Sequence, residues 1–362
     1  MRDHVKLFIP GPIDVSPDTY QAMAAPMIGH RSGDFQELSE EIQPGLQALF
    51  GTSRPIFLST SSAWGVMEGA LRNLAGGKKV LNCCSGAFSD KWHDVTLRCG
   101  FEADKLQKDW GQPLLPQDIH AKLETGDYDL LTLVHNETST GVLNPVQEIS
   151  QVMREFPDVH WIVDTVSSFS TVPVRMDEWG IDVILTGSQK ALALPPGLAL
   201  FAVSERSLDR SATVDGRGYY FDFHEFEKNA RSSMTPSTPC ISLLYGLRHQ
   251  LAKIAQEGLP NRFDRHARLN AKVHTWVKER GFEFFAPEGY RSKSLTCVAN
   301  NKGIDVPSLQ KRMKNQHKIQ LDGGYGKIKG TTFRLSNMGD ETEASIQELL
   351  TSLNSCLHQS AG

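Results

Sequence analysis

The chain has 362 residues, with 40% hydrophobic and 22% charged residues, which are ordinary values for a globular protein with a sizeable core. Its formal net charge of -4 provides no basic field for a polyphosphate backbone, and no basic run lies beside an apolar helix, so we expect neither nucleic-acid nor membrane partners. The six cysteines form no C-x-x-C pair, which favours reduced thiols in a cytoplasmic protein. The chain reaches Pro10 before any long apolar stretch develops, so we expect no signal peptide.

Short apolar runs alternate with amphipathic stretches from about Phe50 to Val203. This pattern predicts βαβ units around a mostly parallel sheet. The expected strands are residues 55–58, 79–83, 130–134, 160–163, 183–186 and 198–203, and the expected helices of this part are residues 63–75, 146–155 and 239–257. Several strands are followed by polar, Gly- or Ser-rich turns, and such turns at the carboxyl ends of strands line the ligand crevice of open α/β sheets.

The pattern changes beyond Gly258. A helix is expected at 261–280, short strands at 282–285 and 295–299, a further helix near 307–315 and a closing helix at 341–358. We therefore predict an α/β protein with a large domain over residues 16–257 and a smaller α+β C-terminal domain over residues 258–362. Residues 1–15 are too few to fold alone, so we expect them to pack on the small domain or on a partner subunit.

Two functional groups stand at the ends of expected strands. Lys190 ends the run Asp182-Val-Ile-Leu-Thr-Gly-Ser-Gln-Lys190, and Asp164 follows His160-Trp-Ile-Val163. Alone, each signal is weak, because a lysine there usually reaches water and an aspartate often caps the next helix. A parallel sheet brings both groups to one crevice, however, and this pair suits pyridoxal phosphate. The amine forms an imine and moves a proton, while the carboxylate keeps the pyridine nitrogen protonated.

A cradle for the cofactor phosphate is expected in Ser59-Thr-Ser-Ser-Ala63. This stretch directly precedes an expected helix, so it offers hydroxyls and backbone N–H groups at a positive helix N-terminus. The same serines could equally be an ordinary helix N-cap.

These residues resemble the class V aminotransferases of fold type I, and especially the branch of alanine:glyoxylate and serine:pyruvate or serine:glyoxylate aminotransferases. The resemblance extends from Pro10-Gly-Pro12 almost to the C-terminus. Its most specific part is Ser188-Gln-Lys190 followed by Pro195-Pro-Gly197, supported by Asn136-Glu-Thr-Ser-Thr-Gly141, Asp164-Thr-Val-Ser-Ser168 and His30-Arg-Ser32.

The resemblance implies a set of cofactor-binding residues. Lys190 would carry the cofactor as a Schiff base, with Asp164 at the ring nitrogen and Thr138 at the phenolic oxygen. The remaining implied positions are Ser62, Ala63, Trp64 and Gln189 around the phosphate, Phe88 and Val166 on the two ring faces, and Thr235 or Ser237 reaching the phosphate of the other subunit in a homodimer.

The resemblance also implies substrate-binding residues and a reaction. Arg334 would clamp the α-carboxylate with two parallel hydrogen bonds, near Gly11. The implied reaction moves an amino group from alanine or serine to glyoxylate or pyruvate. His30 and Arg31 resemble a pair that binds the substrate phosphate in phosphoserine aminotransferases, so phosphoserine:2-oxoglutarate exchange is the alternative, although the pair could also be a surface turn or a subunit contact.

Two positions depart from the family pattern. Ala63-Trp64 replaces the Gly-Thr or Gly-His pair of many relatives, which leaves the role of the Trp64 side chain open. Met234 stands where relatives often carry a polar or aromatic residue.

Other classes of function fit the sequence less well. A nicotinamide-dependent oxidoreductase requires G-x-G-x-x-G after its first strand, whereas Gly324-Tyr-Gly326 lies near the C-terminus, lacks the third glycine and is typical of a turn. The histidines form no H-E-x-x-H, so we expect no metal. A binding scaffold without activity would be favoured if Lys190, Asp164 or Arg334 were missing, and all three are present.

Overall fold

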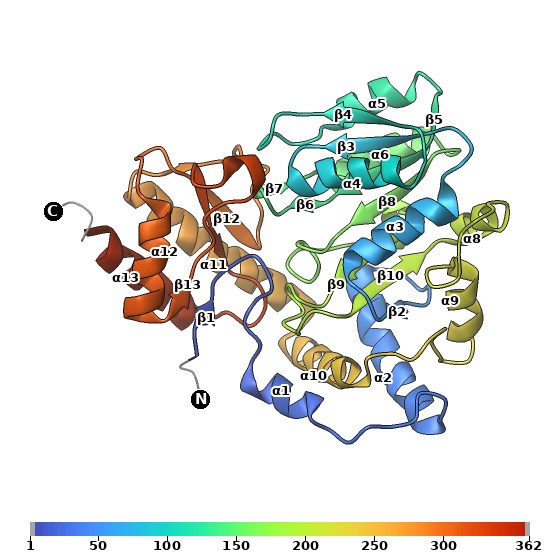
Figure 1. Ribbon diagram of the computed structural model, residues 1–362, viewed down its shortest axis with the longest axis horizontal. Helices are drawn as coiled ribbons and strands as arrows, with labels where there is room; N and C mark the ends of the chain where they lie inside the picture. Colours follow the sequence, from blue (N-terminus) through green and yellow to red (C-terminus); the bar gives the residue numbers. More distant parts are fainter. Residues whose placement is uncertain (1–3, 359–362) are drawn as a thin grey trace.

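A seven-stranded sheet forms the centre of the molecule in the computed structural model, which describes residues 4–358 (Figure 1). In sheet order the strands are β2 (Phe57–Ser59), β10 (Ala199–Val203), β9 (Val183–Gly187), β8 (His160–Asp164), β5 (Tyr128–Val134), β3 (Lys79–Cys84) and β4 (Ala103–Gln107). β10 is antiparallel to both of its neighbours, whereas β9, β8, β5, β3 and β4 pair in parallel. The predicted mostly parallel sheet is confirmed.

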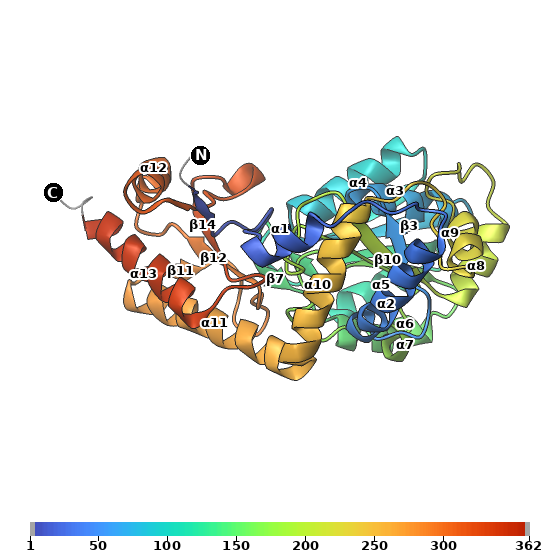
Figure 2. The ribbon, with the colours of Figure 1, turned by 90° about the horizontal axis from the view of Figure 1, so that it is seen from below.

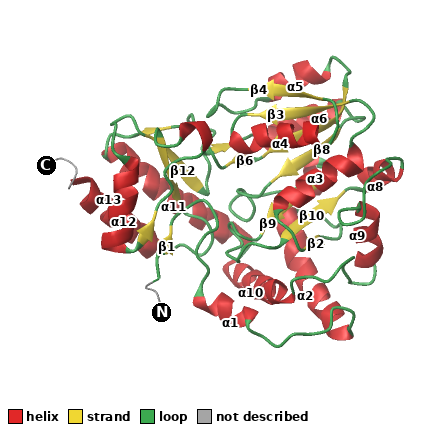
Figure 3. Ribbon diagram, in the orientation of Figure 1, coloured by secondary structure: helices red, strands yellow, loops and turns green. Residues whose placement is uncertain are grey.

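Both faces of this sheet are buried under helices (Figure 3). Leu131 and Leu133 of β5 belong to the core on one face, and Leu130 and Val134 belong to the core on the other, because successive side chains of a strand point in opposite directions. One face carries α2 (Gly33–Phe50), α5 (Pro116–Leu123), α6 (Val146–Glu155), α7 (Met176–Trp179) and α10 (Ile241–Glu257), with α1 (Pro17–Met23) against α10. The other carries α3 (Ala63–Leu74), α4 (Ala87–Arg98), α8 (Glu205–Ala212) and α9 (Phe223–Ala230).

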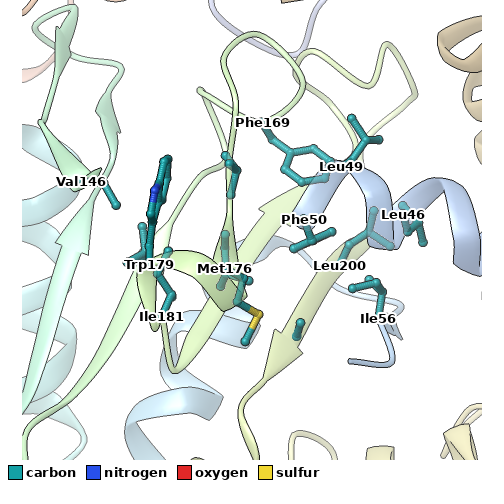
Figure 4. Close-up of a cluster of buried hydrophobic side chains, with 14 of the residues drawn as sticks. Leu46, Leu49, Phe50, Ile56, Val146, Phe169, Met176, Trp179, Ile181 and Leu200 are labelled. Carbon is teal, nitrogen blue, oxygen red and sulfur yellow. The ribbon is translucent and has the colours of Figure 1, made fainter. Parts of the chain in front are cut away.

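The core under α2 holds this helix against the segment that joins β8 to β9 (Figure 4). The rings of Phe50 and Phe169 lie with their centroids 4.5 Å apart, and both side chains are buried. Phe169 follows Asp164 by five positions in the chain, so this packing fixes the backbone just beyond the carboxyl end of β8.

The C-terminal elements build a second core (Figure 2). β11 (Glu283–Phe284), β12 (Leu295–Ala299) and β14 (Thr332–Ser336) form an antiparallel sheet, packed with α11 (Leu259–Glu279), α12 (Val306–His317) and α13 (Glu343–His358). The N-terminal strand β1 (Lys6–Leu7) pairs in parallel with β13 (Ile319–Gln320), and Phe8 enters the same core. The domain boundary at residue 258 itself stays a prediction.

The expected elements occur close to their predicted positions, but several were missed. The sequence analysis did not identify the helices α1, α2, α4, α5, α7, α8 and α9 or the short 3-10 helix η1 (Gly326–Ile328). It also missed the edge strand β4, the paired strands β1 and β13, and the small pair β6 (Asn136–Glu137) and β7 (Val142–Leu143). Within residues 4–358, none of the helices combines the length and apolar character needed to cross a membrane.

Candidate active site

The parallel strands β5, β8 and β9 end at one edge of the sheet. Val134 pairs with Asp164, and Asp164 pairs with Leu185, so Asp164 stands at this edge and Lys190 follows three residues after β9. A cavity of about 290 Å³ opens there. It is lined by Gly11, Pro12, Ser62, Ala63, Trp64, Met67, Phe88, Val134, Thr138, Asp164, Val166, Gln189, Lys190 and Pro196. The cavity therefore brings together every cofactor-binding residue that was predicted to act within its own subunit.

Lys190 presents a buried amine to this cavity. Its side chain is 9% exposed, and its amine donates a hydrogen bond to the carbonyl oxygen of Pro10. Burial, assisted by the charge of Arg334, lowers the pKa of Lys190 to about 8. Gly11 has φ +130, a conformation that favours glycine, and a Cβ atom there would lie 2.8 Å from Cε of Lys190 and displace the end of this side chain. The amine is thus much closer to neutrality than an exposed lysine.

Asp164 is a buried carboxyl group at the end of β8. Its Oδ1 accepts a hydrogen bond of 2.7 Å from the backbone N–H of Val166. Burial raises the pKa of Asp164 to about 7, and the hydrogen bond from Val166 and the charge of Lys190 oppose this shift only in part. A cationic group in the cavity would favour the ionised carboxylate, as a protonated pyridine nitrogen does.

The N-terminus of α3 borders the same cavity. Ser62 is the N-cap residue, and its side chain makes no capping hydrogen bond. The hydroxyl of Ser62 and the first N–H groups of α3 are therefore available to an anion such as a phosphate. Trp64 lines the cavity with its large side chain, and Nζ of Lys91 lies 5.7 Å from the centre of the Trp64 ring.

A buried carboxylate that the sequence analysis missed fixes Phe88. Glu137 is fully buried and accepts hydrogen bonds from the backbone N–H groups of Phe88 (3.4 Å) and Ser89 (3.0 Å) and from the hydroxyl of Ser139 (2.6 Å). The carboxylate thereby satisfies N–H groups in the first turn of α4, where negative charge is favourable. Phe88 enters the cavity from a firmly held backbone. Glu137 lies within a motif that carried the family resemblance, but no sequence signal linked it to α4.

Arg334 lies beside the cavity without lining it. Its side chain is 4% exposed, its Nε donates to Oδ1 of Asp322 at 2.7 Å, and its Nη1 donates to the carbonyl oxygen of Thr138 at 2.9 Å. Thr138 connects the guanidinium to the cavity wall, and its hydroxyl is hydrogen-bonded to that of Ser167. Asp322, which the sequence analysis also missed, sets the orientation of the Arg334 fork.

The remaining predicted residues lie outside the cavity. Nη1 of Arg31 donates to the carbonyl oxygen of Thr235 at 2.6 Å, and the hydroxyl of Thr235 donates to the carbonyl oxygen of Ser237 at 2.8 Å. His30 lies 3.5 Å from the hydroxyl of Thr238. Arg31 therefore braces the segment that contains Thr235 and Ser237, and neither residue of this segment reaches the cavity of its own chain.

The side chains of the cavity fit pyridoxal phosphate. They provide an amine for its carbonyl carbon, a carboxyl group for its ring nitrogen, apolar walls from Phe88 and Val166, and a helix N-terminus with the hydroxyl of Ser62 for its phosphate. The volume is near the lower end of the range of roughly 300–1,000 Å³ usual for ligand pockets. Residues 4–358 hold no group of three His, Cys, Asp or Glu side chains arranged to bind a metal ion.

Comparisons with known proteins agree with this chemistry. The model of the family described as aminotransferase class-V matches residues 16–338. The chain is 37% identical over 337 residues to an uncharacterized aminotransferase of Methanocaldococcus jannaschii, covering 92% of this chain and 87% of that protein. It is 33% identical over 358 residues to a serine–glyoxylate aminotransferase of Methylorubrum extorquens, covering 95% and 88%.

A solved structure is similar over almost the whole chain. The alanine–glyoxylate aminotransferase from Nostoc sp. superposes with a TM-score of 0.93 and 30% identity, covering 99% of this chain and 96% of that one. The family match, the relatives and the residues of the cavity lead to one assignment. The chain belongs to the class-V aminotransferases, which are pyridoxal-phosphate enzymes of fold type I.

Proposed function

We propose that this enzyme transfers the amino group of a small L-amino acid, alanine or serine, to glyoxylate or pyruvate. The observation that carries the proposal is the cavity that joins the buried amine of Lys190 to the carboxyl group of Asp164, with Arg334 connected to it through Thr138. Lys190 provides a base, Asp164 a partner for the cationic cofactor ring, and Arg334 an anchor for the substrate carboxylate.

The residues of the chain divide the work as follows. When bound, pyridoxal phosphate supplies a carbonyl carbon that takes up the amino group and a cationic ring that accepts the electrons of the broken Cα–H bond. Lys190 would hold the cofactor, and its free amine would remove and return the Cα proton; burial lowers the pKa of this amine to about 8. Asp164 would keep the ring nitrogen charged. Arg334 orients the α-carboxylate with the planar fork that Asp322 aligns.

The substrates are proposed from the size of the cavity and from the relatives. Trp64, Met67 and Phe88 line the wall of this cavity of about 290 Å³, and their large side chains favour a small amino-acid substrate. The Methylorubrum and Nostoc relatives are named for different donors, serine and alanine, but for the same acceptor. Glyoxylate is therefore the acceptor that we place first.

Phosphoserine:2-oxoglutarate exchange has less support. Its basis was the pair His30 and Arg31, yet the guanidinium of Arg31 is engaged with the carbonyl oxygens of Thr235 and Pro236 at 2.6 and 3.1 Å. No observation favours this alternative over the first.

Two further properties belong to the proposal. A homodimer would let Thr235 or Ser237 of one chain reach the cofactor phosphate of the other, since neither lines the cavity of its own chain. Their neighbour Met234 is only partly buried, between this segment and the core under α2. A cytoplasmic location agrees with cysteines that are all free thiols.

A matrix of donors and acceptors tests the proposed reaction. Purified enzyme with pyridoxal phosphate is incubated with alanine, serine or phosphoserine against glyoxylate, pyruvate or 2-oxoglutarate, and the amino-acid products are quantified. We expect the highest kcat/KM for alanine or serine with glyoxylate, and no turnover for Lys190→Ala. Turnover confined to phosphoserine with 2-oxoglutarate would overturn the assignment of substrates, and normal turnover by Lys190→Ala would overturn the mechanism.

A further inference from the structure

We propose that Tyr325 is a positioning residue of the active site, because its ring covers Phe88 and lies beside the guanidinium of Arg334. The inference rests on the proposed function in one respect, namely that Phe88 contacts the cofactor ring and Arg334 the substrate carboxylate. It assigns a role to Gly324-Tyr-Gly326, which the sequence analysis interpreted only as a turn.

The stack between Tyr325 and Phe88 is the first observation. The two ring centroids are 5.2 Å apart and the ring planes differ by 19°, the geometry of a stacked aromatic pair. Phe88 lines the cofactor cavity, and its backbone is held by Glu137. Glu137 therefore fixes where the Phe88 side chain begins, and Tyr325 restricts how its ring turns.

The second observation is the position of Tyr325 relative to Arg334. The Cζ atom of Arg334 lies 5.5 Å from the centre of the Tyr325 ring, within the range of a cation–π contact. Asp322, three residues before Tyr325, accepts from Nε of Arg334 at 2.7 Å and from the backbone N–H of Gly324 at 2.8 Å. One short loop thus holds the Arg334 fork through a carboxylate and touches its guanidinium with an aromatic ring.

The loop itself is rigidly shaped and docked. Gly324 has φ +90, and a Cβ atom there would meet the carbonyl oxygen of Ile328 at 2.8 Å, so the chain can turn this tightly only at glycine. Next to Tyr325, Nζ of Lys327 lies 4.4 Å from the ring centre of Trp110, and the indole N–H of Trp110 donates to Asp90 of α4 at 2.9 Å. The loop therefore meets α4, the helix that carries Phe88, directly through Tyr325 and indirectly through Trp110.

The exposure of Tyr325 argues against a role in the core. Its side chain is 44% exposed, and it belongs to none of the buried clusters within residues 4–358. A large ring in this position contributes little apolar burial to the fold. Its ring stacks on Phe88, which lines the cofactor cavity, and lies beside Arg334, the proposed anchor of the substrate. Tyr325 consequently links the loop before β14 to both halves of the active site.

Cofactor binding tests the proposal without requiring turnover. Cofactor-free wild type, Tyr325→Ala, Tyr325→Phe and Tyr20→Ala are titrated with pyridoxal phosphate, and binding is followed by visible circular dichroism and by the fluorescence change of the tryptophans. Tyr20→Ala is a matched control, because Tyr20 is also an exposed tyrosine, at 55%, and does not line the cofactor cavity.

We expect Tyr325→Ala to raise the Kd for the cofactor about 2- to 12-fold, the range that corresponds to the loss of an aromatic pair, and to weaken the circular dichroism of the bound cofactor. Tyr325→Phe, which keeps the ring, should restore both signals. The KM for the amino donor should also rise more in Tyr325→Ala than kcat falls. The thermal midpoint of cofactor-free Tyr325→Ala should match that of Tyr20→Ala.

Two results would overturn the assignment. One is a Tyr325→Ala protein with the Kd and circular dichroism of the wild type, and the other is a Tyr325→Phe protein as impaired as Tyr325→Ala. A wild type that binds the cofactor but transaminates none of the proposed substrates would refute the proposed function instead, and the comparison of Kd values would still decide the role of Tyr325.

Discussion

Replacement of Arg334 by lysine at the proposed carboxylate site keeps the positive charge but removes the planar guanidinium group. Arg334 is 4% exposed and uses two of its nitrogens on Asp322 Oδ1 (2.7 Å) and the carbonyl oxygen of Thr138 (2.9 Å), which fixes the plane of the fork. An ammonium keeps the positive charge but cannot maintain this planar arrangement and meet a substrate carboxylate together. The loss of one buried charge-assisted hydrogen bond is worth about 1.5–3 kcal/mol.

This magnitude sets the expected kinetics. A loss of about 1.5–3 kcal/mol corresponds to a decrease in kcat/KM of roughly 10- to 150-fold, at about 1.4 kcal/mol per factor of ten. The decrease should appear mainly as a higher KM and for every α-amino acid tested, because all of them share the carboxylate. Amines without a carboxylate should react as they do with the wild type, and the cofactor Kd should change little by comparison.

The assay compares steady-state kinetics and cofactor titrations of the wild type, Arg334→Lys and Arg291→Lys. Arg291 is a suitable control because it belongs to the same C-terminal part, with its guanidinium 3.7 Å from the ring centre of Phe284 and outside the cofactor cavity. A loss restricted to one class of amino-acid side chain would refute the reasoning. So would a collapse of cofactor binding with an unchanged donor KM.

Three further predictions follow from the same site. The pKa of Asp164 rises from 3.8 to about 7 on burial, so cofactor-free protein binds more protons when folded and should lose stability as the pH rises from about 4 to 7. Asp164→Asn should lack this loss, and parallel pH dependences of the thermal midpoints of the two proteins would contradict the assigned environment. Glu137→Ala leaves the N–H groups of Phe88 and Ser89 without their acceptor, so it should lower the free energy of unfolding by about 1–3 kcal/mol, as measured by urea denaturation. The control Glu124→Ala, at an exposed position, should change this free energy by less than about 0.5 kcal/mol. Finally, sedimentation should give a dimer. Co-expression of inactive Lys190→Ala with an inactive Thr235→Ala, Ser237→Ala double variant should restore activity, because each hybrid dimer contains one intact site. A fully active monomer, or hybrid dimers without activity, would refute the proposed phosphate contact from the partner subunit.

The elements that could be predicted from the sequence are those with a clear pattern of apolar residues. The inner strands of the sheet are apolar on both faces and are bounded by turns, so their positions were readily identified. β4 was missed because it is an edge strand in which only Leu106 is buried, next to the charged Asp104 and Lys105. α2 was missed because Pro44 and Gly45 interrupt its apolar pattern. Six of its large apolar side chains are nevertheless buried in the core, namely Phe35, Leu38, Ile42, Leu46, Leu49 and Phe50.

Residues of the candidate active site could be predicted where the local sequence pattern alone fixes their position. Asp164 ends strand β8 and Lys190 follows strand β9, and the topology of a parallel sheet places them together. Glu137, Asp322 and Tyr325 were not identified, because their roles depend on contacts with residues far away in the sequence. Glu137 reaches α4 across 49 positions, and Tyr325 meets Phe88 only once the C-terminal part has folded against α4. Contacts between residues so far apart in the chain leave no recognisable pattern in the local sequence.

The central claim is that Lys190 binds the cofactor covalently, and mapping of the modified lysine tests it most directly. The enzyme with bound pyridoxal phosphate is treated with borohydride, which fixes the cofactor to the amine that holds it, then digested and analysed by mass spectrometry. We predict that the phosphopyridoxyl mass is found on the peptide containing Lys190, and that Lys190→Ala gives no labelled peptide. Stoichiometric label on a different lysine, such as Lys91 near Trp64, would contradict the assignment of the site.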